Sequence, residues 1–291
     1  MGMFSEDGTW EWELEEEESG PVEELDKGLL LTTAGHFASG RALARLAAQH
    51  GGARVQLCWS AAVAELRTAS TSTERAEYAH AFGILAQSPA HSAAMGAAGA
   101  MEALTEILRS DDEATTAAAE AIAHLTCANP GNRDAARDAG AIPMLVGMLG
   151  RVADDAGSLG ERGGAIVTAA AAALRNLSYN NGANQEALLG SGGLHHLLRI
   201  VASGDPPTPP DPSAANRQAA YRAAAALENL SGSDEGAARA VVAAGVVPAM
   251  TALLLGSTAA AVSRKAAKKG RGTLLQLALL DRARQDGGQH T

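Results

Sequence analysis

A phrase that recurs along the chain restricts the fold more than any other feature of the sequence. The clearest copies are AAAALRNLSYN at 170–180 and AAAALENLSGS at 223–233, and looser copies are AHAFGILAQ at 79–87 and AEAIAHLTC at 119–127. In both clear copies a glycine, Gly192 or Gly245, follows the last leucine by 15 residues. Self-similarity at a long period indicates an array of stacked units rather than one compact core.

The segments within each repeat have the pattern of amphipathic helices. In AGAIPMLVGML, the apolar residues that recur at i, i+3, i+4 and i+7 are Ile142, Leu145, Val146 and Leu149, and this spacing places them on one helix face. The preceding Ala-Gly is typical of a helix end, because glycine adopts the left-handed conformation at little cost. Each repeat is therefore predicted to contain a short helix, a glycine turn, a second helix, a loop and a longer, Ala-rich third helix.

Two segments carry a resemblance to a known family. The residues NRDAARDAGAIPMLVGML at Asn132–Leu149 and AAAAALRNLS at 169–178 resemble armadillo repeats, and matching segments lie within 223–254. The resemblance covers about residues 75–284, with a degenerate unit at 28–70. It implies an all-α fold, a right-handed α-solenoid of three-helix repeats with a long concave surface.

We expect the chain to have three parts. These are a disordered acidic tail at 1–27, an armadillo solenoid of about five units at 28–284 with degenerate first and last units, and a C-terminal tail at 285–291. Insertions at 150–164 and 202–216 separate the second and third helices of two units. They are either tolerated surface loops, because loop-closure entropy grows slowly with length, or neighbouring recognition loops, the second of them stiffened by prolines.

The chain is not expected to be an enzyme or to hold a cofactor or a metal ion. None of its eight histidines forms an H-E-x-x-H pattern, and its two cysteines do not form C-x-x-C; such spacings are typical of metal sites. The Gly-rich GSGG at 190–193 ends a predicted helix instead of following a strand, so it does not match a nucleotide-binding loop.

The third helices supply the candidate binding residues. In the armadillo proteins that this chain resembles, an asparagine near the end of the third helix binds the backbone of an extended peptide, and this position matches Asn176 and Asn229. An amide with one acceptor and two donors holds a backbone without reading its sequence. The other predicted groove residues are His80, Glu120, His124 and Arg222. The alternative is that both asparagines only cap local backbone at a helix end.

The resemblance does not extend to the lysine-binding slots of the nuclear import receptors. Those members of the family carry a tryptophan four residues before the asparagine, and this chain has Ala172 and Ala225 there. A small methyl group cannot clasp a lysine side chain. The function of an import adaptor is therefore not expected.

The acidic charge is concentrated at the N-terminus. Residues 1–26 hold eleven acidic groups and no lysine or arginine, whereas the remainder has 22 acidic and 23 basic groups. Dense like charge in GTWEWELEEEE, at 8–18, favours disorder. The segment is either a solvated tail, a linear motif in which Trp10, Trp12 and Leu14 dock, or an internal mask for the basic C-terminal helix. As a motif it resembles the tryptophan-acidic peptides bound by kinesin light chains.

A basic patch in SRKAAKKGRG, at 263–272, consists of Arg264, Lys265, Lys268, Lys269 and Arg271. It is either the solvated face of a capping helix, which solenoid ends require, or a contact surface for an anionic polymer or membrane. The neutral body and the lack of interleaved aromatic residues do not favour nucleic acid. A weak nuclear-localisation signal is a further interpretation.

The sequence thus predicts a non-enzymatic protein–protein interaction scaffold or adaptor that binds an extended peptide or helix of a partner in the concave groove. The alternative is a charge-regulated binder of an anionic surface or nucleic acid through the basic C-terminal helix, masked by the acidic tail. A ubiquitin-ligase substrate receptor is a third interpretation, although the chain contains no RING or U-box segment. No stretch approaches the roughly 18 apolar residues of a membrane span, and we expect an intracellular protein, cytoplasmic or nuclear.

Overall fold

The chain divides into two compact units, Met1–Leu57 and Cys58–Thr291. The computed structural model describes residues 59–110, 114–154, 161–203, 214–232 and 235–256, and in addition positions 3–4, 10–11, 271, 273–274 and 277. In the first unit, strand β1 (Met3–Phe4) pairs antiparallel with strand β2 (Trp10–Glu11). This short ladder is what is described of the acidic tail.

The second unit is built from helices. Their bounds are α3 Trp59–Thr68, α4 Ser72–Leu85, α5 Pro89–Ala97, α6 Ala100–Ser110, α7 Ala114–Thr126, α8 Pro130–Asp138, α9 Ala141–Asp154, α10 Glu161–Ser178, α11 Gly182–Gly190, α12 Gly193–Ser203, α13 Ala214–Ser231, α14 Glu235–Ala243 and α15 Val246–Gly256. The described part of this unit thus contains three complete three-helix repeats, α5–α7, α8–α10 and α11–α13. Helices α3 and α4 precede them, and α14 and α15 follow.

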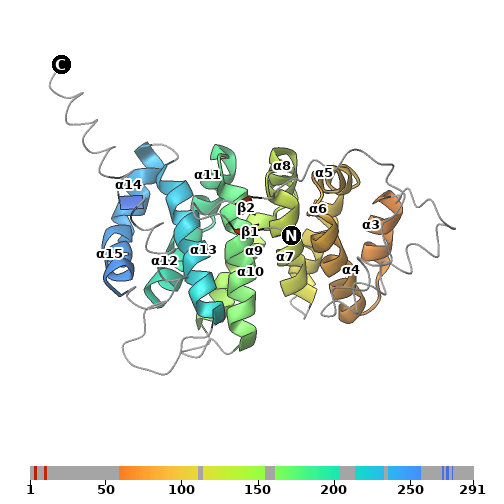
Figure 1. Cartoon of the computed structure of the whole chain (residues 1–291), viewed down its shortest axis with the longest axis horizontal. Coiled ribbons are helices and arrows are strands. Elements are labelled where there is room, and N and C mark those ends of the chain that lie inside the picture. Colours follow the sequence, from red (N-terminus) through yellow and green to blue (C-terminus); the bar gives the residue numbers. More distant parts are fainter. Residues whose placement is uncertain are drawn as a thin grey trace, which may run out of the picture. The chain divides into compact units, whose positions relative to one another are not determined.

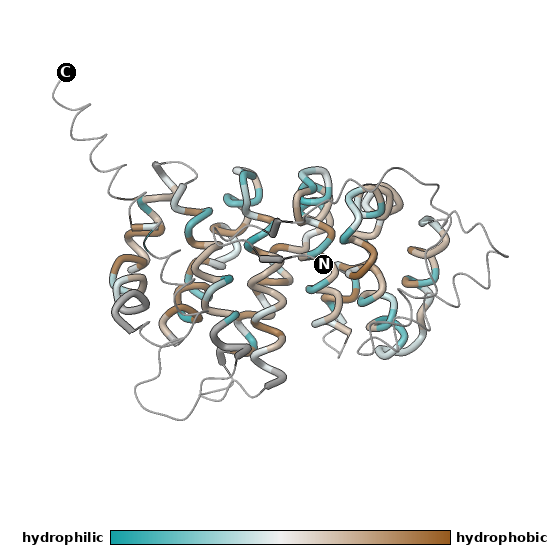
Figure 2. Tube along the Cα trace, in the orientation of Figure 1, coloured by the Kyte–Doolittle hydropathy of each residue, from teal (hydrophilic) through white to brown (hydrophobic). Residues whose placement is uncertain are grey.

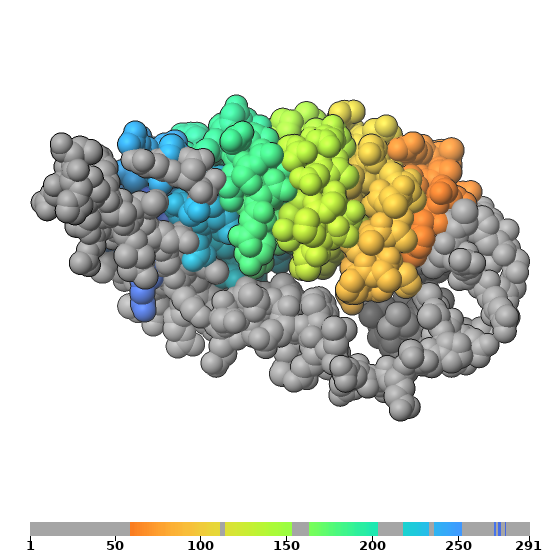
Figure 3. Space-filling view, turned by 90° about the horizontal axis from the view of Figure 1, so that it is seen from above, coloured from red at the N-terminus to blue at the C-terminus, as the bar shows by residue number. Residues whose placement is uncertain are grey.

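The third helices form a continuous row. Helix α4 packs against α7, α7 against α10, and α10 against α13, and Figure 1 shows these helices following one another along the second unit. In the space-filling view the coloured repeats appear as bands in the order of the sequence (Figure 3). The all-α solenoid of three-helix repeats that the sequence predicts is confirmed.

Polar N-cap residues begin the first helices of the three complete repeats. The side chains of Ser88, Asn129 and Asn181 each accept a hydrogen bond from the backbone N–H three residues later. Such caps satisfy donors that have no partner inside the helix. Helix α4 begins with a capping box, in which the side chains of Thr71 and Glu74 each accept from the backbone N–H of the other. The start of each of these helices is therefore determined by residues next to it in the sequence.

A glycine separates the first helix of each repeat from the second. Gly99, Gly140, Gly192 and Gly245 have φ angles of 87°, 82°, 75° and 91°. Residues with a Cβ atom avoid this left-handed region because Cβ approaches the following carbonyl oxygen too closely. The glycine turn predicted from the Ala-Gly pairs is therefore confirmed.

Leucine and alanine form the core. The leucines that end the repeated phrase, Leu85, Leu125, Leu177 and Leu230, are at most 5% exposed. Full burial of such a side chain contributes about 1.5–3 kcal/mol. Figure 2 shows hydrophobic residues interspersed with hydrophilic ones along each helix, as expected for helices with one buried face.

The predicted insertions are partly helical. Helix α9 continues to Asp154 and α10 begins at Glu161, so both helices extend into the insertion at 150–164. Helices α10 and α13 each have 18 residues, whereas α7 has 13. The alanines in both segments have high helix propensity and favour such extension. The remaining positions, 155–160 and 204–213, lie outside the described residues.

Buried asparagines tie the first helices α8 and α11 to the third helix before each of them. The amide nitrogen of Asn132, on α8, donates to the carbonyl oxygen of Leu125 at 2.8 Å, and Asn184, on α11, donates to that of Leu177 at 2.9 Å. Carbonyls at a helix C-terminus have no partner inside the helix. The two asparagines are 4% and 0% exposed. Their amides therefore donate hydrogen bonds to these carbonyl oxygens at sites that water does not reach.

On α8 and on α11, the residue that follows the buried asparagine bonds to the ends of two consecutive third helices. The Arg133 Nε atom donates to the Thr126 carbonyl oxygen at 3.1 Å, and its guanidinium also donates to the carbonyl oxygen of Tyr179 at 3.0 Å. Gln185 repeats this arrangement one repeat later, with donated bonds of 2.8 and 3.2 Å to the ends of α10 and α13. The repeats are therefore joined by hydrogen bonds as well as by apolar packing. We call the four donor residues, Asn132, Arg133, Asn184 and Gln185, the buried ladder.

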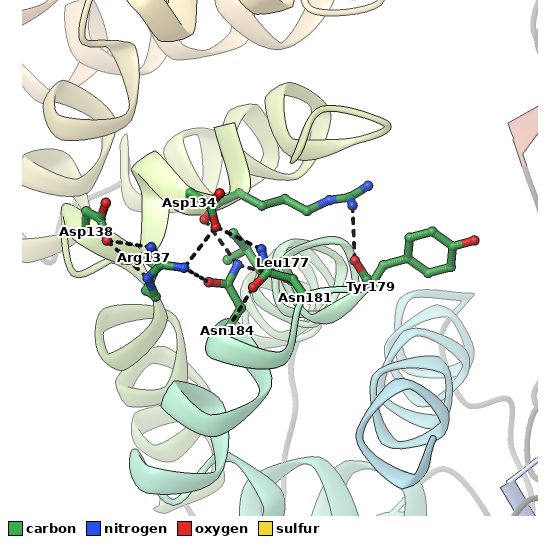
Figure 4. Close-up of polar contacts among 8 residues, drawn as sticks. Asp134, Arg137, Asp138, Leu177, Tyr179, Asn181 and Asn184 are labelled. Atoms are coloured by element: carbon green, nitrogen blue, oxygen red, sulfur yellow. Dashed lines mark hydrogen bonds and ion pairs between the residues drawn. The ribbon is translucent and has the colours of Figure 1, made fainter. Parts of the chain in front are cut away.

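A more exposed network continues this ladder at the surface (Figure 4). Arg137 donates to Asp134 and Asp138, both at 2.9 Å, and to the amide oxygen of Asn184 at 3.3 Å. Asn181 donates to Asp134 at 3.0 Å. The hydrogen bond from Asn181, followed by that from Arg137, lowers the pKa of Asp134 below its ordinary value.

The ladder residues hold a fixed place relative to the glycine turn. Asn184 and Gln185 lie eight and seven residues before Gly192, and the same positions before Gly245 are Ala237 and Ala238. Both alanines are buried. A methyl group cannot donate a hydrogen bond, so α14 lacks the donors that α8 and α11 supply.

Candidate functional site

The predicted groove residues lie on the row of third helices, in a set that we call the third-helix face. Its members are His80 on α4, Glu120 and His124 on α7, Arg175 and Asn176 on α10, and Arg222 and Asn229 on α13. Glu120 and His124 are exposed, and the other five are half-buried. The fold thus brings residues that are up to 149 positions apart in the sequence onto successive helices of one row.

The two asparagines bridge consecutive third helices. The Asn176 Nδ2 atom donates to the carbonyl oxygen of Ala123 at 2.7 Å, and Asn229 Nδ2 donates to that of Arg175 at 2.9 Å. Asn229 also donates to the Ser178 hydroxyl at 3.1 Å. The capping alternative assumed acceptors in the local backbone, but these acceptors belong to the preceding repeat.

Each asparagine nevertheless keeps an acceptor. Within the described part of the chain, neither the Asn176 nor the Asn229 amide oxygen accepts a hydrogen bond, and both side chains are half-buried. The donated bonds restrict the amide to one orientation. The two oxygens therefore lie at the same helical position in successive repeats, where each can accept an N–H from outside.

Two polar side chains, those of His80 and Glu120, lie close together at the N-terminal end of this face. The His80 Nδ1 atom is 3.8 Å from a Glu120 carboxylate oxygen, and the two side chains are 42% and 47% exposed. Exposed pairs at this distance contribute little to stability, about 0–1 kcal/mol. The pair matters for the charge of the face, because the Glu120 carboxylate already has His80 as a partner.

Arg222 is the most desolvated charge of the face. Burial lowers its pKa, the positive charge of Arg175 lowers it further, and Glu120 opposes the shift. Arg222 lies on α13, which packs against α10. Its electrostatic interactions reach Arg175 on α10 and also Glu120 on α7, one helix further along the row.

His124 lies beside the same charge. Desolvation is the main cause that lowers the pKa of His124, and the positive charge of Arg222 adds to it. Its imidazole ring lies over α4: a Cβ atom on Gly83 would be 3.4 Å from His124 Cδ2. The ring has exposed area but many protein neighbours, as expected of a side chain between adjacent helices.

Sequence reasoning missed Arg175. It precedes Asn176 directly, and the position before Asn229 is Glu228, so no repeated pattern marks it. Its electrostatic effect on Arg222 and the bond from Asn229 to its carbonyl oxygen place it in the face.

The other predicted sites are only partly described. Trp10 lies in β2, whereas Trp12 and Leu14 fall outside the described residues. In the basic patch, Arg271 is helical and exposed. The remaining members of the patch, Arg264, Lys265, Lys268 and Lys269, also fall outside.

Among the described residues, no group of three or more His, Cys, Asp or Glu side chains is arranged to hold a metal ion. No helix in the described ranges combines the length and apolar character that crossing a membrane requires.

Solved structures that resemble this chain are armadillo repeat proteins. A designed armadillo repeat protein matches with a TM-score of 0.61 and 23% identity over 75% of this chain and 82% of its own length. A designed armadillo repeat protein in complex with the peptide (KR)4 matches with a TM-score of 0.59 and 22% identity, over 75% and 81%. The armadillo-repeats-only protein ARO from Plasmodium falciparum matches with a TM-score of 0.56 and 21% identity, over 72% and 82%.

No protein-family model and no curated protein matches the sequence. The structural likenesses are nevertheless consistent with one another, and each covers at least 72% of the chain. Together with the three-helix repeats and the glycine turns, they show that this chain has an armadillo-like repeat fold.

Proposed function

We propose that the chain is a non-enzymatic interaction scaffold that binds an extended segment of a protein partner along the third-helix face. The observation that carries the proposal is the pair of amide oxygens on Asn176 and Asn229, which accept no hydrogen bond within the described residues. An extended peptide has backbone N–H groups on both edges that need acceptors. Equivalent amides on successive helices supply such acceptors at regular intervals.

The fold supports this role. One of the similar structures is a designed armadillo repeat protein in complex with a peptide. Ala172 and Ala225 are 4% and 3% exposed, so neither offers an aromatic surface on which a lysine side chain could stack. The segment bound here is therefore expected to differ from a lysine-rich peptide in its side chains, while its backbone is held in a similar way.

Selection from a random peptide display library on the full chain tests the proposal. The double variant Asn176→Ala, Asn229→Ala should weaken binding of a selected peptide about tenfold or more, because two backbone hydrogen bonds are lost. Binding is measured below the melting temperature of the double variant, after circular dichroism confirms its helical content. Glu186→Ala, at an exposed position of first helix α11, serves as the control.

Failure to select any peptide, or equal binding by the double variant, would contradict the proposed function. Binding through the groove should largely survive about 0.5 M salt, whereas binding to phosphates should not. The alternative function, at the basic C-terminal helix, rests on residues of which only Arg271 is described. It stays a prediction, as do the adaptor role and the location in the cytoplasm or nucleus.

A further inference from the structure

The third-helix face contains a cation, Arg222, that no described residue neutralises. Arg222 is half-buried on α13, and within the described residues it makes no hydrogen bond or ion pair. A guanidinium has five N–H donors in a planar fork. Removing these donors from water without offering them acceptors is unfavourable, so an arginine in this position is suited to a ligand that supplies the acceptors.

Charges on two other helices act on Arg222. Arg175 on α10 is close enough for its charge to act on Arg222, and both charges are positive. Burial and Arg175 together outweigh the opposing effect of Glu120, so the pKa of Arg222 is lowered. Glu120 is exposed and lies 3.8 Å from the His80 ring, and it does not form an ion pair with Arg222.

The position of the arginine matches a side-chain site beside the proposed peptide path. Arg222 is seven residues before Asn229 on the same helix, which corresponds to two turns, about 10 Å. Its charge acts across α10 on His124 of α7. Arg222 therefore lies on the helix that carries one of the two asparagines, and this helix packs against α10, which carries the other.

We propose that Arg222 binds the carboxylate of an aspartate or glutamate side chain in the extended partner segment. The inference rests on the proposed function, since Asn176 and Asn229 hold the backbone that presents this side chain. A carboxylate matches the guanidinium fork with two parallel hydrogen bonds. The partner is thus an acidic peptide, of opposite charge to the (KR)4 peptide in the similar designed protein.

The experiment compares peptides selected from one random display library on the full chain and on its Arg222→Gln variant. Peptides selected on the unmodified chain should be enriched in Asp or Glu at one fixed position, and this enrichment should be lost with Arg222→Gln. Replacing the selected Glu by Gln in a synthetic peptide should weaken binding about tenfold or more, as expected for a desolvated charge pair. Arg239→Gln, at an exposed arginine of first helix α14, is the matched control.

A double-mutant cycle separates this contact from general charge. If the two groups touch, the Glu→Gln peptide and the Arg222→Gln protein should lose no more together than either loses alone. Additive losses would overturn the proposal, as would equal binding of the acidic peptide by Arg222→Gln. Selected peptides without acidic enrichment would leave the proposed function intact and refute the carboxylate site. Vesicles of phosphatidylserine that bind the chain only through Arg222, in the absence of acidic enrichment, would also refute it.

Discussion

The side-chain amide of Asn229 donates a 2.9 Å hydrogen bond to the main-chain carbonyl oxygen of Arg175, 54 residues earlier. Asn176 makes the equivalent bond, 2.7 Å long, to Ala123. These bonds join neighbouring repeats and fix the orientation of the amide, whose oxygen accepts no hydrogen bond within the described residues. In the proposed function, stability and recognition are therefore coupled at the same residue.

The buried ladder should be more important for stability than the face. Asn184→Ala leaves the carbonyl oxygens of Leu177 and Arg133 without their donor, at a position that is fully buried. Such a loss destabilises a protein by about 2 kcal/mol or more. Urea unfolding followed by circular dichroism measures it, and Glu186→Ala on the same helix should change stability by less than about 0.5 kcal/mol. Equal effects of the two variants would show that the ladder contributes nothing.

The glycine turns should be sensitive to conformation alone. No atom lies within 4 Å of a Cβ built on either Gly192 or Gly182, but only Gly192 has a positive φ, of 75°. Gly192→Ala should therefore destabilise the chain by about 1–2 kcal/mol. Gly182→Ala, inside a helix, should be neutral or stabilising by up to about 1 kcal/mol. Thermal unfolding of the pair tests this, and a similar change in both melting temperatures would be inconsistent with backbone strain at Gly192.

Removing the charge of Arg222 should alter the titration of His124. Desolvation and then Arg222 lower the pKa of His124, so Arg222→Gln should raise that pKa toward 6.5, the ordinary value. The titration of the His124 ring, assigned by loss of its NMR signal in His124→Gln, measures the shift. An unchanged pKa would mean that the guanidinium does not lie near this ring.

The same shift determines the direction of a stability change with pH. Because the folded pKa of His124 is lowered, the unfolded chain binds this proton more readily as the pH falls through 6.5. Stability should therefore decrease on acidification in that range. His124→Gln should remove this contribution, and a melting temperature with the same pH dependence in both proteins would contradict it.

Asp134 should affect stability at a lower pH than His124 does. Its pKa is lowered chiefly by the hydrogen bond from Asn181 and then by Arg137. The stabilisation is present above the ordinary value of 3.8 and is lost as the pH falls through the folded pKa; the carboxylate must then be protonated. Asp134→Asn should reduce the loss of stability below about pH 4, as measured by urea unfolding across pH, with Asp138→Asn as the more exposed comparison. Parallel curves for Asp134→Asn and the unmodified chain would contradict this contribution.

Much of the fold could be predicted because its determinants are local. The positions of Gly140 and Gly192 follow from a backbone conformation that other residues avoid, and Leu125 and Leu177 follow from the helical period. The lengths of α10 and α13 could not be predicted, since a break in spacing between repeats indicates an insertion but does not show whether it is a loop or additional helix. The sequence predicted every position of the third-helix face except Arg175, but it did not predict their interactions.

The sequence by itself determined the repeat, its helices, its turns and the leucines of its core, because each depends on residues within a few turns of one another. Only the tertiary structure decided which polar groups meet. Asn176 and Ala123 are 53 residues apart, and Arg222 acts on His124 across an intervening helix. The hydrogen-bonding and charge state of a side chain depend on neighbours brought by stacking, and the spacing within one repeat does not contain that information.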